Sequence, residues 1–223
     1  PISGVPIHAE LISALGEVKK AAALANMELG LLPKKIGSAI IEAADEIIAG
    51  NLRSEFIVDF IQGGAGTSIN MNMNEVLANR ALEILGKQKA EYFYCNPNNH
   101  VNMSQSTNDA IPTAIRIASY RLTQDLLEVF RTLVAGIQEK AKEFDDVIKM
   151  GRTHLQDAVP IRLGQEFGAY ANVLTRDINR IERAAQGLLV VNMGATAVGT
   201  GLNATPDYMH SVVQHLIEQT GFS

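Results

Sequence analysis

The spacing of hydrophobic residues predicts a chain built mainly from helices. In the first half, apolar residues recur three and four positions apart, which is typical of a helix with one buried face. This pattern predicts three helices, over residues 9–29, 33–48 and 69–85. Between the second and the third, residues 56–62 form a short apolar run that we interpret as an extended segment.

The second half of the chain carries the same spacing over much longer stretches. Apolar positions predict a helix of about thirty residues over 115–144, roughly 45 Å long at about 1.5 Å per residue, and another over 163–188. The residues between them, which include Pro160, are expected to form a loop. A glycine-rich connection then leads to a last helix over 206–219. Two long helices leave apolar faces uncovered, so we expect further helices from other subunits or from a missing C-terminal part.

A polar segment over residues 87–103 marks the predicted domain boundary. It contains Pro97 and four asparagines, a composition typical of a loop. We therefore predict an N-terminal domain over residues 1–103 and the first part of a central long-helix domain over residues 104–223, both incomplete.

Composition and charge narrow the classes of partner. The formal net charge is −5 and lysines and arginines form no run, which argues against nucleic acid or a membrane as the main partner. A small soluble molecule is expected instead. Cys95 is the only cysteine, which excludes an intrachain disulfide and fits a reducing compartment. The sequence shows no export signal and no apolar stretch of membrane-spanning length, so we predict a cytoplasmic protein.

The densest group of candidate functional side chains precedes the first long helix. Four good N-cap residues stand close together there: Ser104, Ser106, Thr107 and Asn108. We place Pro112 in the first turn after them, where a missing N–H costs nothing. Free N–H groups, several hydroxyls and the positive end of the helix dipole would then converge, which favours an anion-binding site. The alternative is a plain helix cap, which needs only one of these residues.

Two further loops place small polar residues just before a helix. Residues 63–68 combine three glycines with Thr67 and Ser68, and residues 151–157 contain Thr153 and His154. The glycines allow a close approach of the backbone to a ligand, although they could serve only as turns. A phosphate loop is disfavoured because no Lys-Ser or Lys-Thr pair follows. His154 is a candidate for hydrogen bonding to a substrate, and the other histidines lack metal-ligand spacing.

The predicted third helix carries an unusual number of asparagines. Asn70 and Asn74 share one helix face, and Glu75 and Asn79 share another. Both a buried polar network between helices and a ligand site would explain them. We favour the network.

Three segments together resemble the aspartase/fumarase superfamily, in the same order and at similar separations. These segments are Gly-Thr67-Ser-Ile-Asn-Met-Asn, Gln-Ser106-Thr107-Asn108-Asp and Gly-Arg-Thr153-His154-Leu-Gln-Asp-Ala-Val-Pro. Residues 62–68 and 192–197 resemble the ammonia-lyase branch more than class II fumarase. The resemblance implies a mainly α fold, with a long-helix bundle and a smaller, mostly helical N-terminal domain. It also implies a homotetramer whose active sites combine loops from three subunits.

The activity that the resemblance implies is the reversible elimination of ammonia from L-aspartate to give fumarate. By carry-over from the family, Thr67, Ser106 and Thr107 would hold the β-carboxylate of this dicarboxylate substrate. Thr153 would hold the α-carboxylate, and Asn108 and His154 the amino group. No organic cofactor and no metal site is expected, and a divalent cation would act only as an activator.

The resemblance also implies a general base that this sequence does not contain. Family members carry the base serine on a glycine- and serine-rich mobile loop, and the 223 residues end before any such segment. We therefore expect a fragment that holds substrate ligands, with His154 in a supporting role, but is inactive alone. Two alternatives stay open: a class II fumarate hydratase, and a non-catalytic helical assembly module that would not bind aspartate.

Overall fold

The computed structural model describes residues 3–222 and confirms the prediction of a mainly helical chain. It divides into two compact units. One unit contains the described residues up to Ala118 together with those from Leu189 onward, and the other contains residues 119–188. Helix α4 (Thr107–Glu143) begins in the first unit and continues in the second. The domain division at residue 103 stays a prediction.

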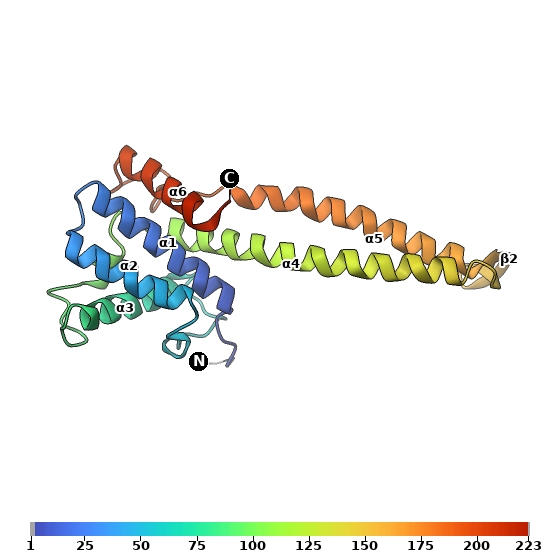
Figure 1. Cartoon of the computed structure of the whole chain (residues 1–223), viewed down its shortest axis with the longest axis horizontal. Coiled ribbons are helices and arrows are strands. Elements are labelled where there is room, and N and C mark those ends of the chain that lie inside the picture. Colours follow the sequence, from blue (N-terminus) through green and yellow to red (C-terminus); the bar gives the residue numbers. More distant parts are fainter. Residues whose placement is uncertain (1–2, 223) are drawn as a thin grey trace. The chain divides into compact units, whose positions relative to one another are not determined.

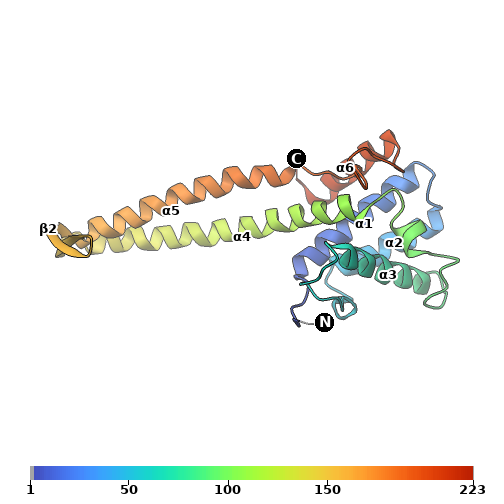
Figure 2. The same ribbon diagram turned by 180° about the vertical axis from the view of Figure 1, so that it is seen from behind.

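The first unit is built around helix α1 (Ala9–Glu28), which packs against α2 (Lys34–Ile48), α3 (Thr67–Ile84) and α6 (Pro206–Thr220). Figures 1 and 2 show α1 between α2 and α6. Alanines at positions 14, 21, 22 and 25 of α1 are completely buried. Their small side chains let neighbouring helices approach on several sides, so α1 is buried around most of its circumference. The predicted bounds of these four helices are correct to within two residues.

The prediction of an extended segment over residues 56–62 is wrong. The chain there is irregular and follows a short 3₁₀ helix, η1 (Arg53–Glu55). Only Phe56 of its large apolar side chains is buried, whereas Ile57, Phe60 and Ile61 are exposed. The carboxylate of Asp59 fixes the segment by accepting hydrogen bonds from the backbone N–H groups of Ser3 and Gly4.

The asparagine-rich loop over residues 87–103 contains one regular turn. Its π-helical turn η2 (Pro97–Val101) is capped by Asn96, whose side chain accepts hydrogen bonds from the backbone N–H groups of Asn98 and Asn99. The asparagines therefore shape the backbone of this loop, as their tendency to bond nearby N–H groups predicts.

The second unit pairs the later part of α4 with α5 (Leu163–Gln186). Leu127, Val134 and Ile178 form its small core, and an ion pair between Arg131 and Glu182 joins the two helices at the surface. Within this unit the two helices lie side by side (Figure 1).

The connection between these helices is a hairpin, so the prediction of a loop around Pro160 is wrong. Strands β1 (Ile148–Thr153) and β2 (Gln156–Arg162) pair in antiparallel register from Ile148 with Arg162 to Thr153 with Gln156. Pro160 is tolerated because each strand of a two-stranded sheet has a free edge, where a missing N–H costs nothing. No helix within residues 3–222 has the length and apolar character needed to cross a membrane.

Gly66 offers a test of how closely α3 and α4 approach. Its φ is +89°, and a Cβ added there would lie 2.9 Å from Cγ2 of Ile111 in α4. Gly66→Ala should therefore lower the free energy of unfolding by roughly 1–3 kcal/mol, as measured by urea denaturation.

Gly63→Ala is the matched control, because a Cβ there meets nothing within 4 Å and its φ is not positive. It should change the free energy of unfolding by less than about 0.5 kcal/mol. Equal effects of the two substitutions would contradict the close approach.

Candidate functional site

The start of α4 is capped by Ser106. Its hydroxyl accepts a hydrogen bond from the N–H of Asn108 at 3.2 Å, and its carbonyl accepts one from the N–H of Ala110 at 3.1 Å. In return, Oδ1 of Asp109 accepts the N–H of Ser106 at 2.9 Å. The arrangement is close to a capping box with aspartate as its acid, although the Ser106 hydroxyl accepts the N–H of Asn108 and not that of Asp109. Ser104, another predicted cap residue, instead donates its hydroxyl to Oδ1 of Asn26 at 2.9 Å.

The buried carboxylate of Asp109 also holds the glycine-rich segment of residues 192–197. Its Oδ2 accepts hydrogen bonds from the N–H groups of Gly194 at 3.1 Å and Thr196 at 3.0 Å. Beside it, Nδ2 of Asn108 donates to the carbonyl of Ala197 at 2.6 Å. The segment that resembles the ammonia-lyase branch therefore lies directly against the first turn of α4.

Pro112 lies inside α4, as its sixth residue, and not in the first turn where the sequence placed it. It has no N–H, so the carbonyl of Asn108 has no donor four residues ahead. The side-chain amide of Asn192 supplies one instead, donating to that carbonyl at 3.0 Å. The proline thus leaves the carbonyl of Asn108 free to accept a hydrogen bond from the glycine-rich segment.

Thr67 is the first residue of α3, and its side chain is exposed. Gly66 brings this helix start close to Ile111 of α4, and Nδ2 of Asn70 donates to Oγ1 of Thr107 at 3.1 Å. The first unit therefore brings together the starts of two helices. With them come four of the predicted substrate residues: Thr67, Ser106, Thr107 and Asn108.

The other two predicted residues, Thr153 and His154, belong to the second unit. Thr153 ends β1, and His154 and Leu155 form the two-residue turn of the hairpin. Both turn residues have positive φ, +50° and +66°, as in a type I′ turn that normally takes asparagine and glycine. Such strain in bulky residues often marks a functional position, and the side chain of His154 is exposed.

A buried polar network adjoins the predicted substrate residues of the first unit. It confirms the interpretation of Asn70 and Asn74 as members of a network between helices. Asn70 and Asn74 of α3 both donate to Oδ1 of Asn102 at 3.2 Å. Lys19 of α1 donates to the same oxygen and to Oε1 of Gln105, each at 2.9 Å. Lys19 is completely buried.

Sequence reasoning missed Lys19. The one available signal is its register, since it follows the buried Leu15 by four positions and so falls on an apolar face of α1. Burial lowers the pKa of Lys19 to about 7, and the nearby charge of Asp109 opposes this shift. Burial, and then the charge of Asp109, raise the pKa of Tyr208 well above its usual value.

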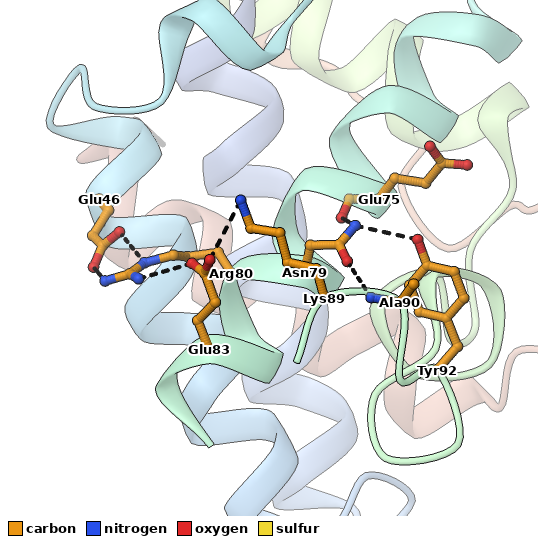
Figure 3. A network of polar contacts seen from close by, with 8 residues as sticks. All are labelled: Glu46, Glu75, Asn79, Arg80, Glu83, Lys89, Ala90 and Tyr92. Carbon is orange, nitrogen blue, oxygen red and sulfur yellow. Dashed lines mark hydrogen bonds and ion pairs between the residues drawn. The ribbon is translucent and has the colours of Figure 1, made fainter. Parts of the chain in front are cut away.

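Two asparagines of α3 lie outside this network. Asn72 donates to the carbonyl of Glu55, whereas Asn79 donates to Tyr92 and accepts the N–H of Ala90 (Figure 3). Figure 3 also shows Arg80 between the carboxylates of two glutamates. These are Glu46 of α2 and Glu83 of α3. These contacts join α3 to α2 and to the loop after α3, beside a cavity of about 410 Å³.

Comparisons with known proteins place the chain among lyases. Residues 2–223 match a family described as lyase. The chain is 61% identical over 221 residues to aspartate ammonia-lyase of Bacillus subtilis and 53% identical over 222 residues to that of Escherichia coli. Each alignment covers 99% of this chain and 46% of the relative. The chain thus spans about half the length of these curated relatives.

Two solved structures share the fold over 98% of this chain. A fumarate lyase:delta crystallin from Brucella melitensis, bound to cobalt, has a TM-score of 0.93 at 49% identity, over 48% of that chain. A class II fumarase from Schistosoma mansoni has a TM-score of 0.89 at 34% identity, over 46% of that chain.

The buried lysine makes stability depend on pH in a defined direction. The pKa of Lys19 is about 7 in the folded chain and lies near the usual lysine value of 10.5 in the unfolded one. Between these values the unfolded state holds the extra proton, so the free energy of unfolding rises with pH. Relative to a Lys19→Met variant, the unmodified protein should gain roughly 2 kcal/mol between about pH 7 and pH 9. Urea denaturation of both proteins across this range measures the gain.

Lys20→Met is the matched control, because Lys20 is partly exposed and pairs with Asp45. Its difference from the unmodified protein should stay nearly constant over the same range. A constant offset for Lys19→Met as well would show that the lysine is not titrating there.

Proposed function

The chain belongs to the lyase family, and from this we propose that the protein is an aspartate ammonia-lyase. It would catalyse the reversible elimination of ammonia from L-aspartate to give fumarate. The observation that carries the proposal is the convergence of two helix starts in the first unit, with hydroxyl groups at both. The high identity to aspartate ammonia-lyases of two bacteria supports the choice of substrate.

The start of α4 suits a carboxylate. Ser106 and Thr107 carry hydroxyl groups at the positive end of the α4 dipole, and Thr67 carries one at the start of α3. Hydroxyl donors at a helix N-terminus attract a negatively charged group. We assign these three residues to the β-carboxylate of the substrate.

Asn108 suits the amino group for a different reason. Its Nδ2 lies 2.6 Å from the carbonyl of Ala197 and must donate to it. The other amide atom, Oδ1, is then the acceptor that an ammonium group requires. Asn108 is exposed, so a ligand can reach it. We assign His154 to the same amino group and Thr153 to the α-carboxylate.

The chemistry explains why such donors matter. Removal of a proton from the carbon beside the β-carboxylate moves negative charge onto the carboxylate oxygens before the amine leaves. Donors already oriented toward those oxygens stabilise this charge without further reorganisation. The residues described here supply binding and charge stabilisation, and no residue among them is assigned as the base.

The second unit supports an oligomer. Leu122, Leu126, Val129 and Leu133 follow one another at three- and four-residue spacing on α4, and all are exposed. A continuous apolar stripe on a helix of a water-soluble domain usually marks a protein interface. We propose that copies of this chain cover it, in a homo-oligomer, as in the homotetramer that the family resemblance implies. A cytoplasmic location and the absence of an organic cofactor are part of the same proposal.

The nearest rival reaction is the hydration of fumarate, because the class II fumarase shares the fold. The deciding measurement supplies the full-length protein separately with L-aspartate and L-malate and follows fumarate by its ultraviolet absorbance. We expect fumarate and ammonia from aspartate and no fumarate from malate. Fumarate from malate alone would make the protein a fumarase. Fumarate from neither substrate would favour the non-catalytic helical assembly module.

Removal of one carboxylate donor tests the assignment of residues. Thr107→Val should lower kcat with aspartate by about 10²–10³, the usual cost of one lost donor to a developing oxyanion. Thr132→Val is the matched control, since Thr132 lies on the same helix, is exposed, and donates its hydroxyl to the carbonyl of Glu128 in the preceding turn. It should stay within about twofold of the unmodified enzyme, because a surface substitution is usually nearly neutral. Equal turnover in the two variants would remove Thr107 from the site.

A further inference from the structure

The side-chain oxygen of one asparagine is the shared hydrogen-bond acceptor of the buried network next to the proposed carboxylate site. Oδ1 of Asn102 accepts three N–H donors, from Lys19 at 2.9 Å and from Asn70 and Asn74 at 3.2 Å each. The amide of Asn102 in turn donates to the carbonyl of Gln105 at 3.3 Å. The network therefore connects α1 and α3 to the loop that leads into Ser106.

Asn70 is the member of this network that reaches the site. Its side-chain nitrogen donates to Oδ1 of Asn102 and to Oγ1 of Thr107, at 3.2 and 3.1 Å. The residue is only 1% exposed. Lys19 and Asn74 fix Asn102 as the acceptor, so a flipped Asn70 amide would set its own oxygen against another oxygen. The amide orientation of Asn70 is therefore determined by its surroundings.

This contact controls which way the Thr107 hydroxyl points. A hydroxyl has one proton to donate and lone pairs that accept. Because Asn70 donates to Oγ1, the Thr107 proton is directed away from Asn70. A carboxylate ligand needs donors only, so a hydroxyl locked as a donor suits it better than one free to rotate.

We propose that Asn70 is a positioning residue that holds the Thr107 hydroxyl as a donor to the substrate carboxylate. The inference rests on the proposed function, because it assumes that Thr107 meets this carboxylate. Asn70 is buried and donates to Thr107, so in this proposal its effect on turnover passes through that hydroxyl.

A double-mutant cycle between Asn70→Ala and Thr107→Val tests this directly. Asn70→Ala alone should lower kcat/KM by about tenfold to a hundredfold, which is less than the loss of the hydroxyl itself. In the Thr107→Val background the same change should cost less than about twofold, because no hydroxyl is left to orient. Full additivity of the two losses would overturn the proposal.

Asn74→Ala is the matched control. Asn74 lies one turn further along α3, is completely buried and donates to the same oxygen of Asn102. No contact of Asn74 with Thr107 is present within residues 3–222. Its effect should be smaller and should add to that of Thr107→Val. Coupling to Thr107 as strong as that of Asn70 would mean a general loosening of the network, and would overturn a specific role for Asn70.

Asn70→Asp keeps the shape of the side chain but turns oxygens toward Oδ1 of Asn102 and Oγ1 of Thr107, where Asn70 places its donor nitrogen. It replaces the donor to Thr107 with an acceptor, so the hydroxyl should turn toward it and kcat/KM should fall at least as far as in Asn70→Ala. Circular dichroism checks that the helices persist. Activity equal to that of the unmodified enzyme would overturn the proposal.

The activity of the unmodified protein on aspartate and on malate distinguishes a failure of this inference from a failure of the proposed function. If it releases fumarate from aspartate, the cycle is measured on aspartate, and an additive cycle refutes only the role of Asn70. If it acts on malate instead, the ammonia-lyase proposal fails and the cycle is measured on malate. If it turns over neither, the cycle is read from fumarate affinity by calorimetry. Failure to bind fumarate would overturn both.

Discussion

The buried carboxylate of Asp109 is the interaction on which the candidate site depends. It accepts N–H groups from Ser106, Gly194 and Thr196, and so joins two segments almost ninety positions apart in the chain. A buried carboxylate left without such donors is costly, so the two segments are held together strongly. The position of Asn108 follows from this, because the segment that Asp109 holds also carries the carbonyl that orients the Asn108 amide.

Sequence spacing predicted the helices well because each must bury a face every three to four residues. The spacing of apolar residues did not predict the hairpin of β1 and β2. Nearly all of β2 is exposed, so the strand has no buried face to impose an alternating pattern, and its turn uses His154 and Leu155 in place of Asn-Gly. The asparagine network was predicted on α3, but its shared acceptor, Asn102, lies outside that helix and no local pattern identifies it. Motifs made Thr67, Ser106 and Thr107 candidates, whereas Lys19 could be recognised only from the packing of α1.

Part of the backbone strain lies in the candidate loops. Non-glycine residues with positive φ occur in all three of them and in the glycine-rich segment: Ala65, Ser104, His154, Leu155 and Thr196. A side chain in this region of backbone space costs energy that the surrounding contacts must offset. Asp109 accounts for Thr196 and Asn26 for Ser104, since each bonds directly to the strained residue. Leu52, Ala90 and Asn203 also have positive φ, so the candidate loops hold part of the backbone strain of the chain and not all of it.

The single cysteine in the sequence, Cys95, has a practical consequence for labelling experiments. Cys95 is buried, and burial raises the pKa of its thiol to about 11. Because the thiolate is the reactive form, alkylating reagents will leave this position nearly untouched while the fold persists. A cysteine introduced at an exposed position, such as the hairpin turn, would therefore carry a fluorescent or spin label almost alone, and the region around His154 can be observed by spectroscopy without removing the native thiol.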